Sequence, residues 1–347
     1  MTQKTISKNT SMKKVILTGA NGFVGHHVLE HFLKNTDWEI YCIDKLSYAS
    51  SGHDRIRDIK AFDDKRVKTF TTDLCMPFPE GLVHELGEIE YIFHLAADSH
   101  VDNSISNPVP FVQNNVNSIL YLLEYAKNLK NLKKFVYFST DEVYGSAPEG
   151  TNYVEGARFN CGNPYSASKA AGESICQAYS NTYGLPIIVT NTMNVVGERQ
   201  HPEKFVPMII RKVLAGESVT IHSNADRTKA GSRFYIHARN VADALLYIIY
   251  NTTETLDNYD ASLGKFHIVG EREFDNLELA QTIAGILGKE LKYEMVDFHS
   301  SRPGHDLRYA MDGHKMKGLG WSHPMAINES LEKTIKWTLE NDRWLNI

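Results

Sequence analysis

The sequence predicts an α/β protein: a doubly wound parallel sheet followed by a smaller mixed α/β lobe. Two observations predict the sheet. Short apolar segments alternate with longer helical ones up to about residue 197, and a glycine-rich turn directly follows the first apolar segment. Beyond that point the alternation becomes irregular, which predicts the lobe. With 347 residues the chain is longer than a single core normally supports.

The expected strands are short apolar runs rich in β-branched and aromatic residues. In the sheet they cover 13–20, 39–46, 66–74, 89–97, 132–140 and 186–197, with helices over 22–35, 107–129 and 163–184. In the lobe we expect helices over 205–216 and 278–288 and strands over 218–223 and 265–270. The expected domains are therefore a nucleotide-binding domain at 12–195, to which 234–262 returns a strand and a helix, and a lobe made of 196–233 and 263–347.

The composition argues against several functional classes. A net charge of -5 and a pI near 6.3 give no reason to expect nucleic acid as a partner. No apolar run approaches the ~20 residues needed to cross a bilayer, so no membrane is expected either. The first dozen residues are polar and lack the apolar core of a signal peptide, which predicts a tail. The four cysteines have no CxxC spacing, which predicts reduced thiols, no metal site and a cytoplasmic protein.

The first apolar segment ends in glycines spaced GxxGxxG: Gly19, Gly22 and Gly25. Glycines let the backbone turn tightly and approach a pyrophosphate, which binds the free N–H groups at the start of the next helix. Asp44 ends the second strand 19 residues later, where a carboxylate binds the ribose hydroxyls of NAD and repels the 2′-phosphate of NADP. Lys45 beside it would weaken that repulsion. We expect a Rossmann-type domain that binds NAD.

Other residues at strand ends are expected in the same crevice, because the carboxyl ends of parallel strands meet at one edge of a sheet. Asp73 follows the third strand, where capping of a helix is an equally good interpretation. The remaining expected cofactor contacts are Asn21, Phe23, Val24, Leu74, Leu95, Ala96, Ala97 and Ser139.

Tyr165 and Lys169 form a YxxxK pair within the helix expected over 163–184. Residues four apart share one face of a helix. The ammonium is therefore expected near the phenol, where it would lower the tyrosine pKa from about 10 and make the phenol a usable base. The preceding strand ends in Ser139 and Thr140, whose hydroxyls are placed to orient a substrate hydroxyl.

Two adjacent carboxylates, Asp141 and Glu142, follow that strand with no turn residue between. Such a pair at the end of a buried strand is costly unless the chemistry needs both. Mutual repulsion and burial favour a single shared proton, so the pair can supply one acid and one base together. Loop capping or a salt bridge is the structural alternative.

Together, the glycine motif, Asp44, "HLAA" at 94–97, the Ser/Thr strand end and YxxxK resemble an extended short-chain dehydrogenase/reductase. Five segments are similar to the nucleotide-sugar 4,6-dehydratases, most closely those acting on dTDP-glucose: "STDEVYG", "HLAADSHVDNSI", "NPYSASKA", "HPEKFVP" and "RPGHDLRYAMD". The resemblance covers about residues 13–340. The "TDEVYG" and "RPGHDLRYA" segments are specific, whereas the glycine motif indicates only the superfamily.

The resemblance implies a lyase of deoxysugar biosynthesis that converts a dTDP- or UDP-hexose to its 4-keto-6-deoxy form. Tyr165 would take the proton of the sugar 4-hydroxyl, oriented by Thr140, as hydride leaves C4 for NAD⁺. Glu142 would then remove the C5 proton while protonated Asp141 gives its proton to the leaving 6-hydroxyl. Hydride finally returns from NADH to C6. Lys169 is implied to hold the nicotinamide ribose as well.

The same resemblance implies a set of contacts to the sugar, the pyrophosphate or the base. They are Ser99, Asn194, Lys204, Phe205, His222, Arg233, His267, Arg302 and His305. Arginine suits a pyrophosphate because its planar fork binds oxyanions through two hydrogen bonds. For Arg233 and Arg302 a surface ion pair is the alternative.

Four departures from the family pattern gather at this substrate end. Val195–Val196 replaces a usual Asn-Tyr, and His267 replaces an Asn that is implied to contact the pyrophosphate. The segment 222–233 is longer than usual, and it begins with His222 in place of Tyr. The sequence therefore defines the reaction better than the substrate, and UDP-glucose, UDP-GlcNAc or an unusual sugar stays open.

Two alternative functions also stay open. A nucleotide-sugar 4-epimerase or decarboxylase would use the same cofactor and Tyr–Lys pair but needs no acid–base pair for elimination. A catalytically idle NAD-binding scaffold would need neither the Tyr–Lys pair nor the two carboxylates. The resemblance further implies a homodimer through the helices at about 104–129 and 164–183, although core packing would explain their apolar faces equally well.

Overall fold

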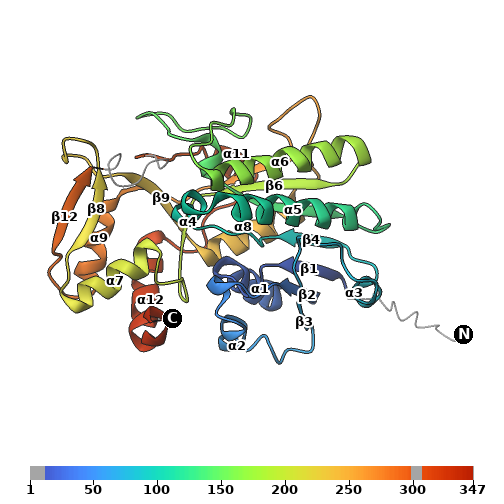
Figure 1. The fold of residues 1–347 in the computed structure, drawn as a ribbon, viewed down its shortest axis with the longest axis horizontal. Helices are drawn as coiled ribbons and strands as arrows, with labels where there is room; N and C mark the ends of the chain where they lie inside the picture. The colour runs from blue at the N-terminus through green and yellow to red at the C-terminus, as the bar shows by residue number, and fades with distance from the viewer. Residues whose placement is uncertain (1–11, 298–306, 347) are drawn as a thin grey trace, which may run out of the picture.

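The computed structural model describes residues 12–297 and 307–346, so nearly all of the expected N-terminal tail lies outside the described residues. Its largest unit is a seven-stranded sheet in which all neighbouring strands are parallel (Figure 1). The strand order is β10-β6-β5-β4-β1-β2-β3. The bounds are β1 (Lys14–Thr18), β2 (Glu39–Asp44), β3 (Val67–Thr71), β4 (Tyr91–His94), β5 (Lys134–Thr140), β6 (Ile187–Thr192) and β10 (Lys265–Ile268). The doubly wound sheet is confirmed, and its order reverses between β1 and β4, where such sheets bind ligands.

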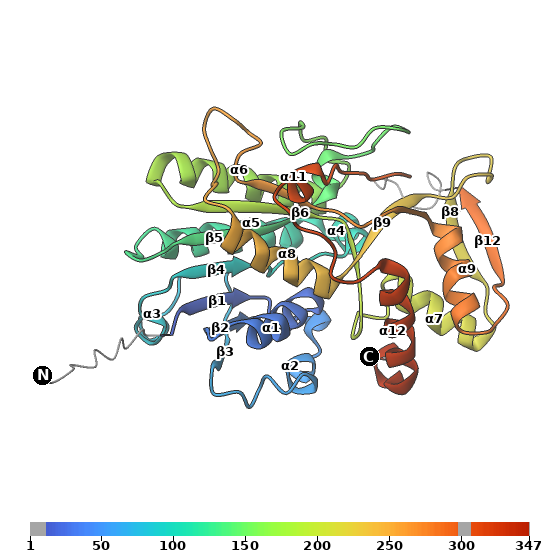
Figure 2. The ribbon, with the colours of Figure 1, turned by 180° about the vertical axis from the view of Figure 1, so that it is seen from behind.

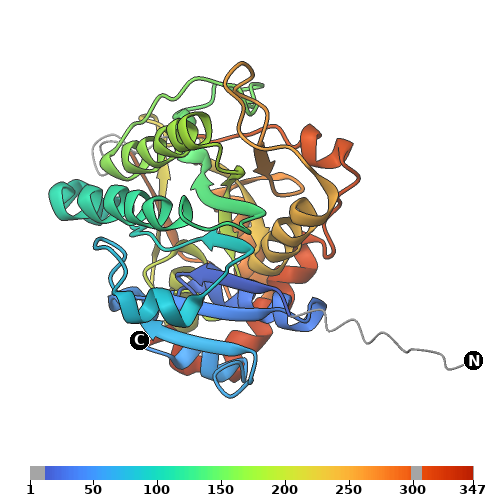
Figure 3. The ribbon, with the colours of Figure 1, turned by 90° about the vertical axis from the view of Figure 1, so that its right-hand side faces the viewer.

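Helices cover both faces of this sheet because its strands are apolar on both sides. In β1 the Ile16 side chain packs into one core, whereas Val15 and Leu17 pack into the other. One face carries α1 (Phe23–Asn35) and α8 (Ala238–Asn251). The other carries α3 (Glu80–Leu86), α5 (Pro108–Ala126) and α6 (Pro164–Tyr183). Figure 3 shows α5 and α6, in blue-green and green, on the opposite side of the strands from the gold α8.

Short helices connect these elements. They are η1 (Tyr48–Ser50), α2 (Asp54–Asp58), α4 (Val101–Ser106), η2 (Asp141–Tyr144), α11 (His314–Gly318) and η3 (Asp342–Leu345). None of the helices in the two described ranges is long and apolar enough to cross a bilayer.

The smaller lobe lies at one end of the molecule (Figure 2). It contains a three-stranded sheet of β7 (Asn194–Val196), β9 (Ser232–His237) and β11 (Glu273–Asp275), and a two-stranded sheet of β8 (Val219–Ser223) and β12 (Tyr293–Asp297). Helices α7 (Phe205–Ala215), α9 (Asn276–Ile286) and α12 (Ile327–Glu340) share its core. The expected mixed α/β lobe is confirmed. Helix α12 was not expected, although Ile327, Leu331 and Ile335 recur at the spacing of one helix face.

Two elements lie in a different sheet from the one expected. β10, expected in the lobe, pairs with β6 at the edge of the large sheet, because Phe266 and Ile268 pack into the core beneath α8. β9, expected to return to the large sheet, instead pairs with β7 and β11 in the lobe. Only the helix that follows it, α8, returns to the nucleotide-binding domain, where it packs on α1.

Candidate active site

Two adjoining cavities lie at the carboxyl ends of the parallel strands. The first is lined by the β1–α1 turn and by the ends of β2, β4 and β5. The second lies between α4, η2 and the lobe elements α7, β8 and β9. Ser99, Glu203 and Lys204 line both cavities, so the two are continuous at these residues.

In the β1–α1 turn beside the first cavity, Gly19 and Gly25 have no room for a side chain. Gly19 has φ +71, and a Cβ built on it would lie 2.8 Å from the Ala96 nitrogen. A Cβ on Gly25 would lie 2.0 Å from the Gly19 oxygen. Gly22 precedes α1 without any side-chain cap, so the first N–H groups of the helix are open to a ligand. A backbone cradle at a helix N-terminus fits a pyrophosphate, as the sequence predicted.

Asp44 is held in position by the backbone around it. Its Oδ2 accepts a hydrogen bond from the Asn21 N–H (3.0 Å), and its Oδ1 accepts one from the Leu46 N–H (2.9 Å). Burial raises its pKa. The carboxylate lines the first cavity, where its remaining lone pairs suit ribose hydroxyls. Asn21, expected to contact the cofactor, lies behind Asp44 instead, and its side-chain oxygen is 3.0 Å from His53 Nδ1.

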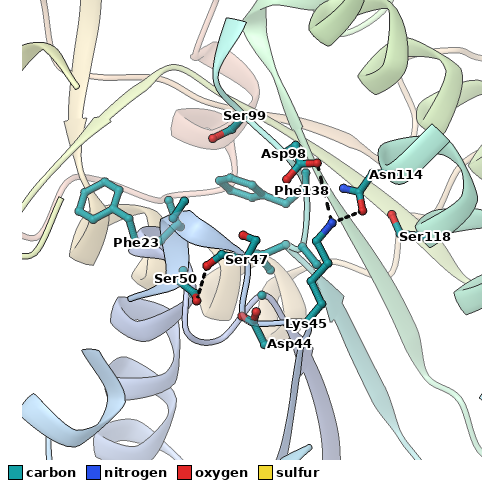
Figure 4. Close-up of a pocket in the computed structure, with 18 of the residues that line it drawn as sticks. Phe23, Asp44, Lys45, Ser47, Ser50, Asp98, Ser99, Asn114, Ser118 and Phe138 are labelled. Atoms are coloured by element: carbon teal, nitrogen blue, oxygen red, sulfur yellow. Dashed lines mark hydrogen bonds and ion pairs between the residues drawn. The ribbon is translucent and has the colours of Figure 1, made fainter. Parts of the chain in front are cut away.

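Lys45 points away from Asp44 and across the first cavity (Figure 4). Its ammonium donates a hydrogen bond to Asn114 Oδ1 on α5 (2.6 Å) and lies 3.9 Å from the Asp98 carboxylate. These partners hold the cation away from Asp44, so the expected weakening of selectivity for NAD over NADP has no support in this geometry.

The structure brings the other expected cofactor contacts together around the first cavity. Phe23, Val24, Asp73, Leu74, Leu95, Ala96, Ala97 and Ser139 all line it. Asp73 also accepts a hydrogen bond from the Cys75 N–H (2.9 Å), so it closes a local turn as well. Sequence reasoning missed the loop after Asp44, from which Ser47, Tyr48, Ala49 and Ser50 line the same cavity. Its proximity to Asp44 in the sequence was the available signal.

Thr140 ends β5, and Asp141 starts η2 directly after it. Thr140 Oγ1 donates to Asp141 Oδ1 (3.0 Å), and the same oxygen caps η2 by accepting from the Glu142 N–H. Asp141 is 4% exposed, and its Oδ2 has no hydrogen-bond partner among the described residues. Burial, reinforced by the neighbouring Glu142 charge, raises the pKa of Asp141 to about 7. This carboxyl can therefore carry a proton near neutrality.

Glu142, in contrast, lines the second cavity. Its Oε2 accepts a hydrogen bond from Asn163 Nδ2 (3.1 Å), and Asn163 also caps α6. The two adjacent carboxyl groups thus have different surroundings, one buried and one facing the cavity. Different surroundings are what separates an acid from a base in a pair of carboxylates.

Tyr165 and Lys169 both line the first cavity from the first turns of α6, which starts with a capping box at Asn163 and a proline at its first position. Their electrostatics differ from the prediction. The pKa of Tyr165 is raised by burial and by the Glu142 charge, which together outweigh the opposing effect of Thr140. Lys169 Nζ lies 4.3 Å from the centroid of the Tyr137 ring, and burial lowers its own pKa to about 8.

The second cavity gathers most of the expected substrate contacts. Ser99, Asn194, Lys204, Phe205, His222 and Arg233 line it. The Arg233 guanidinium is held by the carbonyls of Ser232 (2.7 Å) and Leu307 (2.6 Å), and it lies over the Tyr309 ring at 4.4 Å. An ordered arginine at the wall of a cavity suits a phosphate ligand. Arg302 and His305 lie outside the described residues.

His267 does not reach either cavity. It lies in β10, fully buried, with Nε2 2.8 Å from the Tyr144 hydroxyl and Nδ1 3.2 Å from the Asp312 carbonyl. Because β10 belongs to the large sheet, the residue packs inside the protein, and its expected contact to the pyrophosphate is not supported. Asn276 lines the second cavity instead, at the start of α9, and accepts a hydrogen bond from Tyr235 (3.0 Å). The pair Asp275–Asn276 at the start of a helix was the sequence feature that could have indicated this residue.

Residues 15–264 match the family model of the NAD dependent epimerase/dehydratase family. The chain therefore belongs to this family, in which the cofactor is NAD. It is 33% identical to dTDP-glucose 4,6-dehydratase 1 of Escherichia coli K12, over 96% of this chain and 94% of that protein. A trifunctional UDP-glucose 4,6-dehydratase of Arabidopsis thaliana is 32% identical over 96% of this chain and 48% of its own length.

Solved structures give the same relationship. A dTDP-glucose 4,6-dehydratase from Streptomyces venezuelae, crystallised with NAD and TYD, superposes with a TM-score of 0.82 at 30% identity, covering 95% of this chain and 98% of that one. A Thermus thermophilus UDP-glucose 4-epimerase complexed with NAD reaches a TM-score of 0.79 at 26% identity, covering 93% and 98%. The fold is thus shared by dehydratases and epimerases, and only the site can distinguish between the two reactions.

Proposed function

We propose that this chain is an NAD-dependent nucleotide-sugar 4,6-dehydratase, a hydro-lyase. The observation that carries the proposal is the end of β5: Ser139 lines the first cavity, Glu142 lines the second, and the buried Asp141 directly precedes Glu142. Tyr165 lines the first cavity together with Ser139 of the same strand end. The dehydratases among the relatives, which span nearly the whole chain, support the same reaction.

In the first step, Tyr165 would receive the proton of the sugar 4-hydroxyl. Bound NAD would supply the hydride acceptor at C4 and later the hydride donor at C6. Thr140, at the neighbouring end of β5, would orient the same hydroxyl. Because burial raises the pKa of the phenol, it needs a neighbouring positive charge to act as a base, and Lys169 is the candidate on the same helix face.

In the elimination step, one carboxyl would give a proton and the other would take one. Glu142 faces the cavity and would remove the C5 proton, which the 4-ketone has acidified. Asp141, with a pKa of about 7, would donate its proton to the 6-hydroxyl, which leaves as water. A 4-epimerase or a decarboxylase has no use for this second proton transfer, so the pair favours the dehydratase over both.

The reaction can be tested by supplying a panel of dTDP- and UDP-sugars and following each by mass spectrometry. A dehydratase gives a product that has lost one water, and in D₂O that product gains one deuterium at C5. An epimerase gives a product of unchanged mass. Turnover without loss of water, or a product without deuterium at C5, would contradict the proposed mechanism.

For the substrate we propose only a class: a hexose linked through a diphosphate to a pyrimidine nucleoside. Relatives described as dTDP- and UDP-glucose dehydratases are almost equally similar to this chain, at 33% and 32% identity. His222, a departure from the family pattern, lines the second cavity beside Thr220 on β8. The sugar panel therefore doubles as a test of base preference.

We also propose a homodimer in a reducing, cytoplasmic compartment. Helices α5 and α6 pack side by side on the outside of the sheet, and Val109 and Tyr183 expose apolar surface on them. All four cysteines are free thiols, which supports the compartment. Sedimentation equilibrium would test the dimer, and a charged substitution at Val109 should weaken it if this face is the interface.

A further inference from the structure

A buried charged cluster lies directly behind the β5 strand end, and the proposed reaction does not use it. Its centre is Glu173 on α6, which is 2% exposed. Glu173 Oε1 accepts hydrogen bonds from Ser139 Oγ (2.6 Å) and Asn191 Nδ2 (2.7 Å). Its other oxygen, Oε2, lies 3.0 Å from Lys265 Nζ on β10. One carboxylate thus joins a helix to three neighbouring strands of the large sheet.

Two of these contacts reach residues of the candidate active site. Ser139 lines the first cavity, and its hydroxyl donates a hydrogen bond to Glu173. Asn191 Nδ2 donates a second hydrogen bond to the Thr140 carbonyl (3.1 Å), which ties the next residue of the strand end to the same cluster. Short hydrogen bonds to a charged acceptor are stronger than neutral ones. The carboxylate therefore holds the Ser139 hydroxyl directly and the Thr140 backbone through Asn191.

Glu173 also shares a helix face with Lys169, which lies four residues before it. Lys169 is 3% exposed, and a buried cation loses its proton more readily than an exposed one. The titratable groups whose charges act on Lys169 or whose rings contact it are His94 on β4, Tyr137 on β5, and Glu173 and Cys176 on α6. Among these groups, Glu173 carries the negative charge that favours protonated Lys169.

We propose that Glu173 is a positioning residue of the dehydratase site: its carboxylate fixes Ser139 directly and Thr140 through Asn191, and its charge acts on Lys169 one turn earlier in α6. Lys265 is its counter-ion, which lets a carboxylate persist inside the protein. The role in the reaction rests on the proposed function, whereas the effect on Lys169 does not. Other charges facing Glu173 come from Lys169 and Lys265, with the neutral Tyr137, Tyr144, Cys161 and Cys176 around it.

The test measures the pKa of Lys169 directly, in the full chain loaded with NAD. Lysine labelled with ¹⁵N gives an Nζ signal that moves with protonation, and Lys169→Arg identifies the signal. In Glu173→Gln, the Lys169 pKa is expected to fall by about one pH unit, since a nearby negative charge has been removed. Glu155→Gln is the matched control, because it neutralises another buried carboxyl, near His267. In this variant the Lys169 pKa should not move.

Glu173→Gln leaves Lys265 buried without its counter-ion, so this variant alone could fail to fold. The double variant Glu173→Gln/Lys265→Met removes both charges and should fold while keeping the lowered Lys169 pKa. A folded single or double variant with an unchanged Lys169 pKa would overturn the proposal. So would a double variant that does not fold, because Glu173 would then be needed for the fold itself.

The catalytic half of the proposal has its own readout. With a substrate that the wild-type protein dehydrates, the alkaline limit of the C4 oxidation rate should move to lower pH in the double variant, together with Lys169. If the wild type dehydrates no sugar in the panel, the proposed function fails while the Lys169 measurement still decides the effect of Glu173. If the wild type does dehydrate a sugar and the pH limit stays in place, the positioning role is wrong.

Discussion

Asp141 is a buried carboxyl whose surroundings disfavour its negative charge. Its carboxyl is 4% exposed, and one oxygen has no partner among the described residues. Its pKa in the folded chain is about 7, against an ordinary value of 3.8. The folded state therefore holds a proton that the unfolded chain has released, so this residue makes the protein less stable as pH rises from about 4 to 7. Active-site residues often carry this kind of cost.

Asp141→Asn should remove that penalty. At pH 8 the free energy of unfolding is expected to rise by about 1–4 kcal/mol, since an amide needs no proton to be buried in this position. Activity should fall at least 10²-fold because the amide cannot donate a proton to the leaving hydroxyl. Urea unfolding at pH 5 and pH 8 checks the first expectation. A variant that gains no stability at pH 8 relative to pH 5 would show that Asp141 is not protonated in the native state.

Glu142→Gln should separate the two halves of the reaction. Oxidation at C4 does not need this carboxylate, so NADH is expected to appear and persist, while formation of the 4-keto-6-deoxy product falls by about 10²–10⁴-fold. Stopped-flow absorbance at ~340 nm follows the reduced cofactor. Product formation at the wild-type rate would mean that another group is the base.

Tyr165→Phe should instead stop the first step. Without the phenol there is no acceptor for the 4-hydroxyl proton, so no absorbance at ~340 nm is expected under single-turnover conditions. Since the pKa of Tyr165 is raised in the protein alone, the wild-type oxidation rate should increase with pH over the range in which Lys169 stays charged. An oxidation rate that is independent of pH would contradict the phenol as base.

At the scale of elements, the β1–α1 turn was predictable because its requirement is local. A close approach of backbone to backbone needs glycine, and the motif shows this directly. The β5 strand end was predictable for a similar reason, since adjacent carboxylates after an apolar run are rare without a use. In contrast, the sheet that β10 joins depends on long-range packing of Phe266 and Ile268, and no local pattern records it. The expected contact of His267 to the pyrophosphate came instead from the family resemblance, and the structure does not support it because the side chain is fully buried.

Gly25→Ala tests the turn. The new Cβ would meet the Gly19 backbone oxygen at 2.0 Å, and backbone cannot move aside without opening the cradle. We expect NAD affinity to fall more than about 10-fold, with a stability loss of about 1–3 kcal/mol. Gly285→Ala in α9 is the matched control, because nothing lies within 4 Å of its Cβ and alanine favours a helix by about 1 kcal/mol. Calorimetric titration with NAD compares the two, and equal affinities would contradict the cradle.

At the scale of the whole molecule, one carboxylate ties the C-terminus to the nucleotide-binding domain. Asp58 on α2 accepts hydrogen bonds from Trp344 Nε1 (3.0 Å), from Arg199 Nε (3.2 Å) and from Arg343. Trp344 in turn packs its ring against the buried guanidinium of Arg55 at 5.2 Å. Sequence reasoning could not find this contact, because its partners are separated by up to 286 residues.

Asp58→Ala should therefore destabilise the protein by about 1–3 kcal/mol, since three donors lose their acceptor at once. Asp64→Ala is the control: its partner Arg66 lies only two residues away on the surface, and little change is expected. Thermal unfolding followed by circular dichroism measures both. Equal midpoints for the two variants would show that the C-terminal contact adds nothing to stability.

The position of β10 also has a consequence for how the protein is made. The edge strand β10 of the large sheet is translated after β7, α7, β8 and β9 of the lobe, so the strands of the sheet that emerge earlier leave one side of β6 unpaired until then. The same holds for any fragment that ends at residue 264, where the family match stops. An uncovered strand edge invites pairing with other chains. During synthesis, the edge of β6 therefore stays open to such pairing until residue 268 has emerged.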